Sequence, residues 1–128
     1  MTFPPETSEI VLVEDDPGVR DALQFSLRLA GYSVRAYARA ENALSDTFPR
    51  PVCLVVDQRL GANDGLELIR RLRDQHGVTP AVLIASYPGP ALCRRAAAAD
   101  VAIVEKPLIG DRLLETIGQM SRRAAGPT

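Results

Sequence analysis

Short apolar runs recur along the chain and are separated by more polar segments. The runs span residues 9–14, 32–38, 51–57, 80–86 and 101–106. The first, third and fourth are nearly continuous in Val, Leu and Ile, which is typical of central parallel strands covered by helices on both faces. The second run alternates apolar with polar residues such as Arg35, and it therefore predicts an edge strand.

A helical spacing of apolar residues follows each of these runs. We predict one helix that Asp16 caps and Gly31 ends, a short one over 40–47, one between Asp64 and Gly77, one over 90–99, and one striped by Leu113, Ile117 and Met120. Asp64 and Glu67 have the spacing of a capping box, and the neighbouring Arg94 and Arg95 indicate a solvated helix face.

Strands that alternate with helices of this length predict a doubly wound α/β fold, in which right-handed crossovers connect five strands of a parallel sheet. A length of 128 residues suits one domain with its own core. We place that domain at residues 9–121 and expect flexible segments at 1–8 and 122–128.

Composition excludes several classes of protein. Hydrophobic residues make up 46% and charged residues 24% of the chain, as in ordinary globular domains, and the net charge of −1 favours neither nucleic acid nor an anionic membrane as a partner. Membrane insertion is not expected, because no apolar stretch reaches about 18 residues. The start of the chain lacks the features of a secretory signal, and Cys53 and Cys93 are too few for a disulfide framework, so we expect the cytoplasm.

Lysine usage singles out one position. The chain has 15 basic residues, and all except Lys106 are arginine. A lone lysine indicates a place where a compact, flexible ammonium is needed in preference to a planar guanidinium.

Polar side chains follow the ends of four predicted strands. They are Glu14, Asp15 and Asp16 after the first, Asp57 after the third, Ser86 after the fourth and Lys106 after the fifth. The carboxyl ends of parallel strands lie at one edge of the sheet, where ligands of such folds bind. We therefore expect these side chains to converge, with Asp16 serving as a helix cap more than as a ligand.

Several carboxylates at one edge repel each other and need a cation. Oxygen ligands without His or Cys favour a hard divalent ion, above all Mg²⁺. A lysine and a hydroxyl beside that ion would accept a phosphoryl group, and a carboxylate can act as the nucleophile toward phosphorus. Asp57, an ionisable residue at the end of a buried strand, is the candidate nucleophile.

Taken together, the motifs resemble the receiver domain of two-component response regulators over residues 9–121. They are "LVEDDPGVRDAL", "VVDQRLGANDGLELIRRLR", "IAS" and "VEKP". The resemblance implies a flavodoxin-like sheet with strand order 2-1-3-4-5 and five helices. It also implies a signalling module that catalyses only its own phosphorylation and dephosphorylation, and so is not an enzyme with a separate substrate.

The resemblance assigns roles to individual residues. Glu14 and Asp15 would bind Mg²⁺ together with Asp57 and the backbone carbonyl of Arg59. Asp57 would accept the phosphoryl group from a sensor histidine kinase or a phosphotransfer protein. Lys106 and Ser86 would bind phosphoryl oxygens, Ser86 by moving inward as the switch, and Lys106-Pro107 would be a cis peptide.

The sequence departs from the family pattern near the switch. Ile103 stands where the family usually has an aromatic residue, and bulky Tyr87 follows Ser86 where a small residue is usual, so Tyr87 could shield the site. Gly61 replaces a usual proline, and "YPGP" at 87–90 stiffens the approach to the fourth helix. These departures put the output mechanism in question and leave the acids and the lysine intact.

Two alternatives and the partners stay open. The chain could be an interaction domain that works without phosphorylation, or, less favoured, a small-molecule phosphatase, although Arg59 occupies the position where such enzymes carry a general acid. The resemblance implies a homodimer face formed by helix four, strand five and helix five. The downstream target, and whether this is a single-domain regulator or the receiver of a longer chain, are left open.

Overall fold

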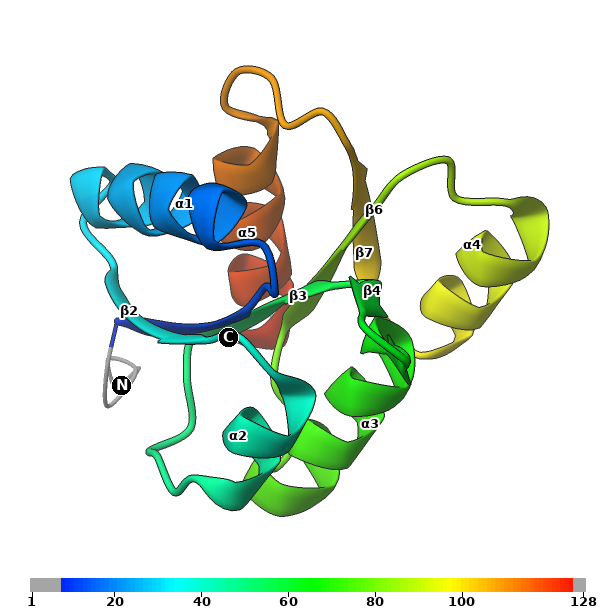
Figure 1. Ribbon diagram of the computed structural model, residues 1–128, viewed down its shortest axis with the longest axis horizontal. Coiled ribbons are helices and arrows are strands. Elements are labelled where there is room, and N and C mark those ends of the chain that lie inside the picture. Colours follow the sequence, from blue (N-terminus) through cyan, green and yellow to red (C-terminus); the bar gives the residue numbers. More distant parts are fainter. Residues whose placement is uncertain (1–7, 126–128) are drawn as a thin grey trace.

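The computed structural model describes residues 8–125 and contains one five-stranded parallel sheet in the order β2-β1-β3-β6-β7 (Figure 1). The strands are β1 (Glu9–Val13), β2 (Ser33–Tyr37), β3 (Cys53–Asp57), β6 (Ala81–Ala85) and β7 (Ala102–Glu105). Each lies within one of the predicted apolar runs. Counted within the sheet, the order is the expected 2-1-3-4-5, and β2 is an edge strand as predicted.

Five helices cover the two faces of the sheet. They are α1 (Pro17–Leu29), α2 (Ala40–Ser45), α3 (Gly65–His76), α4 (Pro90–Ala98) and α5 (Arg112–Ala125). α1 and α5 pack on one face, while α2, α3 and α4 pack on the other (Figure 1). The predicted doubly wound α/β fold is confirmed. None of the helices in residues 8–125 has the length and apolar character needed to cross a bilayer.

Alternation along the central strand β3 divides the core in two. Cys53 and Val55 pack with α1 and α5, whereas Leu54 and Val56 pack with α2, α3 and α4. All four side chains are at most 1% exposed, which explains why the run is continuously apolar. A strand buried in this way fixes the position of the carboxylate that ends it.

A two-stranded hairpin follows β3 and was not predicted. β4 (Arg59–Leu60) pairs antiparallel with β5 (Asn63–Asp64) around Gly61, whose φ of 64° suits a residue without a Cβ. Strands of two residues are too short to leave a period in the sequence. The hairpin leads directly from Asp57 to the start of α3.

Three local expectations can be compared with the structure. Asp16 and Asp64 cap α1 and α3 as predicted, because their carboxylates accept backbone N–H groups of the first turns. The capping box is wrong in its second half, since the Glu67 carboxylate accepts from Arg70, one turn further along α3.

The predicted tail at 122–128 is wrong over residues 122–125. α5 continues to Ala125, because Arg122, Arg123 and Ala124 favour helix and Arg123 Nη2 donates to Asp100 Oδ1 at 3.0 Å. The rest of the tail, and residues 1–7 of the predicted flexible start, lie outside the described residues.

Candidate functional site

The edge of the sheet at the carboxyl ends of β1, β3 and β7 gathers the predicted acids and the lysine. One carboxylate oxygen from each of Glu14, Asp15 and Asp57 lies within 4.8 Å of the other two. Lys106 Nζ lies 3.0 Å from Asp57 Oδ2 and 3.9 Å from Glu14 Oε1. The convergence expected from the strand ends is therefore present for the three acids and Lys106.

The three acids differ in how far they are exposed. Glu14 is 1% and Asp57 5% exposed, while Asp15 is open to solvent. Burying an ionised carboxylate is costly unless a charge or hydrogen bond compensates it. Lys106 compensates Asp57 by direct contact, and its 3.9 Å separation leaves Glu14 less well compensated.

The buried carboxyl group of Glu14 is poorly compensated in this arrangement. The pKa of its carboxyl is raised from 4.5 to about 8, because burial and, after it, the nearby Asp57 carboxylate outweigh the opposing effects of the Asp16 backbone N–H and Lys106. Glu14 Oε2 accepts from the Asp16 N–H at 3.2 Å, but the buried Oε1 has no hydrogen-bond partner. An unpartnered buried oxygen next to two further carboxylates suits a hard cation.

Backbone contacts fix the positions of Asp57 and Lys106. Asp57 Oδ1 accepts from the Arg59 N–H at 3.2 Å, and the Lys106 N–H donates to Ala85 O at 2.9 Å. The first contact orients the Asp57 carboxylate, and the second holds the backbone of Lys106 against the end of β6. The Lys106-Pro107 peptide is cis, as the resemblance implied.

Two residues that support Asp57 were missed in the sequence. A Cβ on Gly65 would lie 2.2 Å from the carbonyl oxygen of Asp57, so only glycine lets α3 begin this close to the end of β3. Gln58 Oε1 accepts from the Leu66 N–H at 3.1 Å and ties the same helix start to the strand. A glycine directly after an N-cap, where helix formers are preferred, was the available signal for Gly65.

Ser86 and Tyr87 lie in the loop after β6 and are both exposed. No side-chain hydrogen bond joins Ser86 to the acids within residues 8–125, so the structure does not bring its hydroxyl onto them. Tyr87 has a φ of 48° and is 92% exposed. In this conformation Tyr87 does not cover the site, against the expectation that it could shield it.

Ile103, where the family pattern has an aromatic residue, is an aliphatic side chain of β7. Ile103 lies on β7 opposite Leu83, is half-buried and packs against the core shared by α2, α3 and α4. An aliphatic side chain held in this position has no ring to rotate between an inward and an outward state. The structure therefore supplies no aromatic switch at this position.

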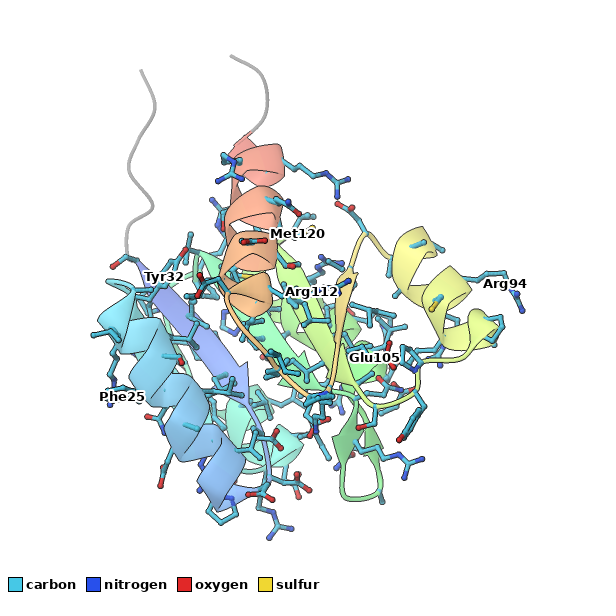
Figure 2. The ribbon with its side chains drawn as sticks, turned by 90° about the horizontal axis from the view of Figure 1, so that it is seen from above. Phe25, Tyr32, Arg94, Glu105, Arg112 and Met120 are labelled. Carbon is cyan, nitrogen blue, oxygen red and sulfur yellow. The ribbon has the colours of Figure 1, made fainter. Side chains whose placement is uncertain are left out.

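The arginine pair of α4 is only partly a solvated face. Arg94 points outward, away from the sheet (Figure 2), whereas Arg95 Nη2 lies 2.8 Å from Asp64 Oδ2. Burial pushes the pKa of Asp64 up, but Arg95, Gln58 and the Leu66 N–H together hold it below its ordinary value. Arg95 thus links α4 to the cap of α3.

Comparisons with known proteins agree with this geometry. The model of the response regulator receiver domain family matches residues 10–118. The transcriptional regulatory protein FixJ of Bradyrhizobium diazoefficiens is 32% identical over 118 residues, which cover 90% of this chain and 57% of FixJ. The C4-dicarboxylate transport transcriptional regulatory protein DctD of Pseudomonas aeruginosa is 32% identical over 86% of this chain and 24% of its own length.

Solved structures show the same fold. A CheY-like receiver domain protein from Methanospirillum hungatei superposes with a TM-score of 0.80 at 21% identity and covers 92% of this chain and 96% of that chain. Full-length FixJ from B. japonicum gives a TM-score of 0.76 at 29% identity, over 97% of this chain and 61% of that chain. The chain thus spans little more than half of FixJ and about a quarter of DctD.

Proposed function

The chain belongs to the response regulator receiver domain family, and on that premise we propose that it accepts a phosphoryl group on Asp57 and thereby switches an interaction surface. The observation that carries the proposal is the contact between Lys106 Nζ and Asp57 Oδ2 at 3.0 Å, beside the two acids that follow β1. The donor would be the phosphohistidine of a sensor histidine kinase or of a phosphotransfer protein.

Asp57 would act as the nucleophile. One of its carboxylate oxygens attacks phosphorus, the phosphorus–nitrogen bond of the phosphohistidine breaks, and the bonding electron pair returns to the imidazole. The Arg59 N–H contacts Oδ1 at 3.2 Å and Lys106 Nζ contacts Oδ2 at 3.0 Å, so the two contacts together would orient the attacking carboxylate. Hydrolysis of the aspartyl-phosphate would then end the signal. The chain would thus catalyse only its own phosphorylation and dephosphorylation and turn over no separate substrate.

Lys106 would contact Asp57 before the transfer and the phosphoryl group after it. Its ammonium pairs with Asp57 Oδ2 before transfer, and its flexible stem lets it bind a phosphoryl oxygen afterwards. Ser86 would supply a second contact by moving inward from its exposed position. That movement requires the loop after β6 to rearrange.

The donor set fits a hard divalent cation. Glu14, Asp15 and Asp57 would hold Mg²⁺, and the backbone carbonyl of Arg59 would complete the protein ligands. When bound, Mg²⁺ neutralises charge on the phosphoryl oxygens during transfer. The unpartnered buried Oε1 of Glu14 supports this assignment.

The output would pass through α4. The inward movement of Ser86 pulls on the segment that leads into α4, and Arg95 connects α4 to the cap of α3. We propose that phosphorylation shifts an existing equilibrium of this region and exposes or hides the α4-β7-α5 face to a downstream protein or a second copy.

Incubation with Mg²⁺ and acetyl phosphate, followed by intact-mass measurement, tests the proposal. We expect a phosphoryl mass gain that Asp57→Asn abolishes and Asp74→Asn, a change of an exposed acid on α3, leaves intact. No gain with acetyl phosphate or with a phosphorylated histidine kinase would contradict the proposal.

A phosphorylation-independent interaction domain is the second candidate. Ile103 favours this candidate, because an aliphatic side chain has no ring that could rotate as a switch. Tyr87 favours it because its exposed ring departs from the small residue that usually follows the hydroxyl residue. This candidate predicts no phosphoryl gain and an unchanged interaction surface in Asp57→Asn.

A further inference from the structure

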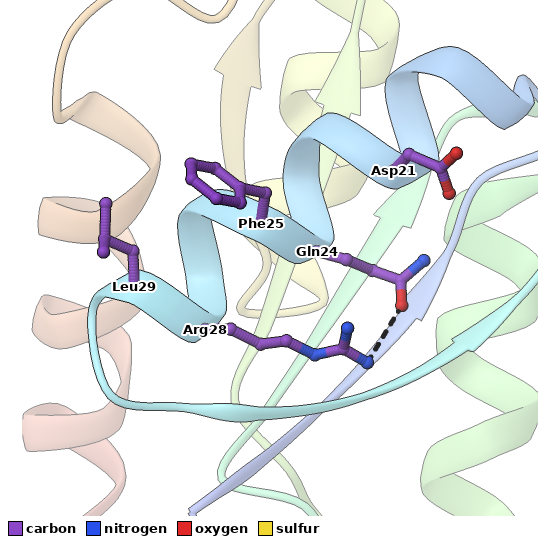
Figure 3. A pocket seen from close by; sticks show the side chains of 5 residues that line it. All are labelled: Asp21, Gln24, Phe25, Arg28 and Leu29. Carbon is purple, nitrogen blue, oxygen red and sulfur yellow. Dashed lines mark hydrogen bonds between the residues drawn. The ribbon is translucent and has the colours of Figure 1, made fainter.

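The outer side of α1 exposes large apolar side chains. Phe25 is 70% and Leu29 78% exposed, although Leu23 and Leu27 on the inner side are buried in the core. Figure 2 shows Phe25 on the outside of the helix, and Figure 3 shows the two side chains beside the polar ones of α1. The other large exposed apolar residues in the described chain, Val78, Tyr87 and Ile109, lie singly in loops.

The exposed apolar positions of α1 have the spacing of a coiled-coil seam. Gly18, Ala22, Phe25 and Leu29 follow one another at intervals of four, three and four residues, and all four are exposed. Such a spacing places them in one line along the helix. We call this line the α1 seam. Its first half carries small residues and its second half carries large ones.

We propose that the α1 seam pairs antiparallel with the α1 seam of a second copy about a two-fold axis. In that arrangement Leu29 lies over the second copy's Gly18, and Phe25 lies over the second copy's Ala22. Each large side chain then meets a small one, and the symmetry repeats both contacts. A two-fold interface requires this kind of self-complementarity.

The charges beside the seam select the antiparallel direction. Asp21 and Arg28 flank the seam on the same side, as Figure 3 shows, seven residues apart. Antiparallel pairing brings Asp21 of each copy next to Arg28 of the other, whereas parallel pairing along the same seam would leave both charges without this partner. Within residues 8–125 neither forms an ion pair, and Arg28 Nη2 donates only to the neutral Gln24 Oε1 at 3.1 Å.

The size of the contact sets the expected strength. One helix of 13 residues on each side forms an interface at the small end of the range, below about 1,200 Å² in total. The dimer is therefore weak and reversible. The proposal does not depend on phosphorylation, because the seam includes none of the acids or Lys106.

Sedimentation velocity of the full chain, from about 10 µM to about 1 mM, measures the association across the weak range expected for so small a contact. We expect a concentration-dependent dimer that Leu29→Glu abolishes. Val78→Glu, which adds the same charge at a residue 83% exposed in a loop, should leave it unchanged. Circular dichroism checks that both variants remain folded.

Charge reversal gives the sharper test. Asp21→Arg alone or Arg28→Asp alone places like charges together twice, and each should weaken the dimer about tenfold or more. The double variant restores both pairs and should restore the dimer. A contact that does not use these residues would show no such rescue.

Three results would overturn the proposal. The chain could stay monomeric to about 1 mM, above the concentration at which a weak specific dimer becomes visible. A dimer could form and survive Leu29→Glu and both single charge reversals. Finally, the parent and Leu29→Glu could both be monomers, with phosphoryl transfer to the variant slower from a histidine kinase and unchanged from acetyl phosphate. That result would assign this face of α1 to the kinase.

Discussion

α3 and α4 lie next to each other on one face of the sheet, yet they are attached to it very differently (Figure 1). α3 buries five of its twelve residues, and its start touches the backbone of Asp57. α4 has nine residues and buries only Ala96, with Leu92 partly buried beside it.

The remaining attachments of α4 are polar. Arg73 of α3 donates to the carbonyls of Ala99 and Asp100 at its end, and Arg95 pairs with Asp64 along its length. Segments with few buried apolar contacts open at lower free energy than the core does. The difference indicates that α3 holds the end of β3 in place, whereas α4 is attached more weakly and would be the helix that responds under the proposed function.

Truncation of core leucines gives the largest expected effect. Leu72→Ala on α3 should lower the free energy of unfolding by about 2–5 kcal/mol, because Leu72 is 0% exposed and a cavity would remain. Leu92→Ala on α4 should cost about 1 kcal/mol or less, since Leu92 is only half-buried. Urea denaturation measures both, and equal losses would remove the distinction between the helices.

Glycines before the two helices give a second, smaller contrast. Gly65→Ala should cost about 1–3 kcal/mol, because the added Cβ meets the Asp57 carbonyl at 2.2 Å and must push α3 or β3 aside. It should also slow phosphoryl uptake from acetyl phosphate. Gly89→Ala, which has open space around it and extended backbone, should stay within about 0.5 kcal/mol of the parent.

The buried Glu14 carboxyl should make the stability of the fold depend on pH. The folded-state pKa of Glu14 is raised from 4.5 to about 8, so between these values the folded chain holds a proton that the unfolded chain has lost. Without Mg²⁺, the contribution of Glu14 therefore favours folding below pH 4.5 and is lost as the pH rises to about 8, with a slope of at most about 1.4 kcal/mol per pH unit.

Glu14→Gln provides the control for this dependence. The variant keeps the size of the side chain and cannot titrate, so urea denaturation from pH 5 to 8 should show a flatter profile than the parent. If the stability of the parent changes through this range by the same amount as that of the variant, Glu14 does not carry the effect.

Loss of the link between the helices should have the smallest effect on overall stability. Arg95→Ala removes a half-exposed ion pair and should cost at most about 1 kcal/mol. Hydrogen exchange in α4 should nevertheless become faster, because the tie to the cap of α3 is gone. Arg94→Ala, which removes the outward-pointing neighbour, should leave exchange in α4 unchanged.

The same contrast separates what the sequence could predict from what it could not. Hydrophobic periodicity predicted the sheet and the helices, since buried strands such as β3 are continuously apolar. Once the strands were placed, the polar residues at their carboxyl ends predicted that Glu14, Asp57 and Lys106 lie close together. Local patterns also predicted the caps Asp16 and Asp64.

Contacts between distant segments left no such pattern. Arg95 and Asp64 are 31 residues apart, and the closeness of Gly65 to Asp57 depends on how α3 docks on β3. The hairpin around Gly61 has strands too short for a period. The end of α5 was predicted too early because its contact with Asp100 is tertiary.

Hydrogen exchange with and without Mg²⁺ and acetyl phosphate tests the central claim most directly, because it reports on Asp57 and on the two helices in one experiment. We predict that phosphorylation changes the exchange of α4 and the loop before it, leaves α3 unchanged, and has no effect in Asp57→Asn. A phosphorylated chain whose α4 exchanges as before, or an Asp57→Asn variant that responds like the parent, would contradict the account.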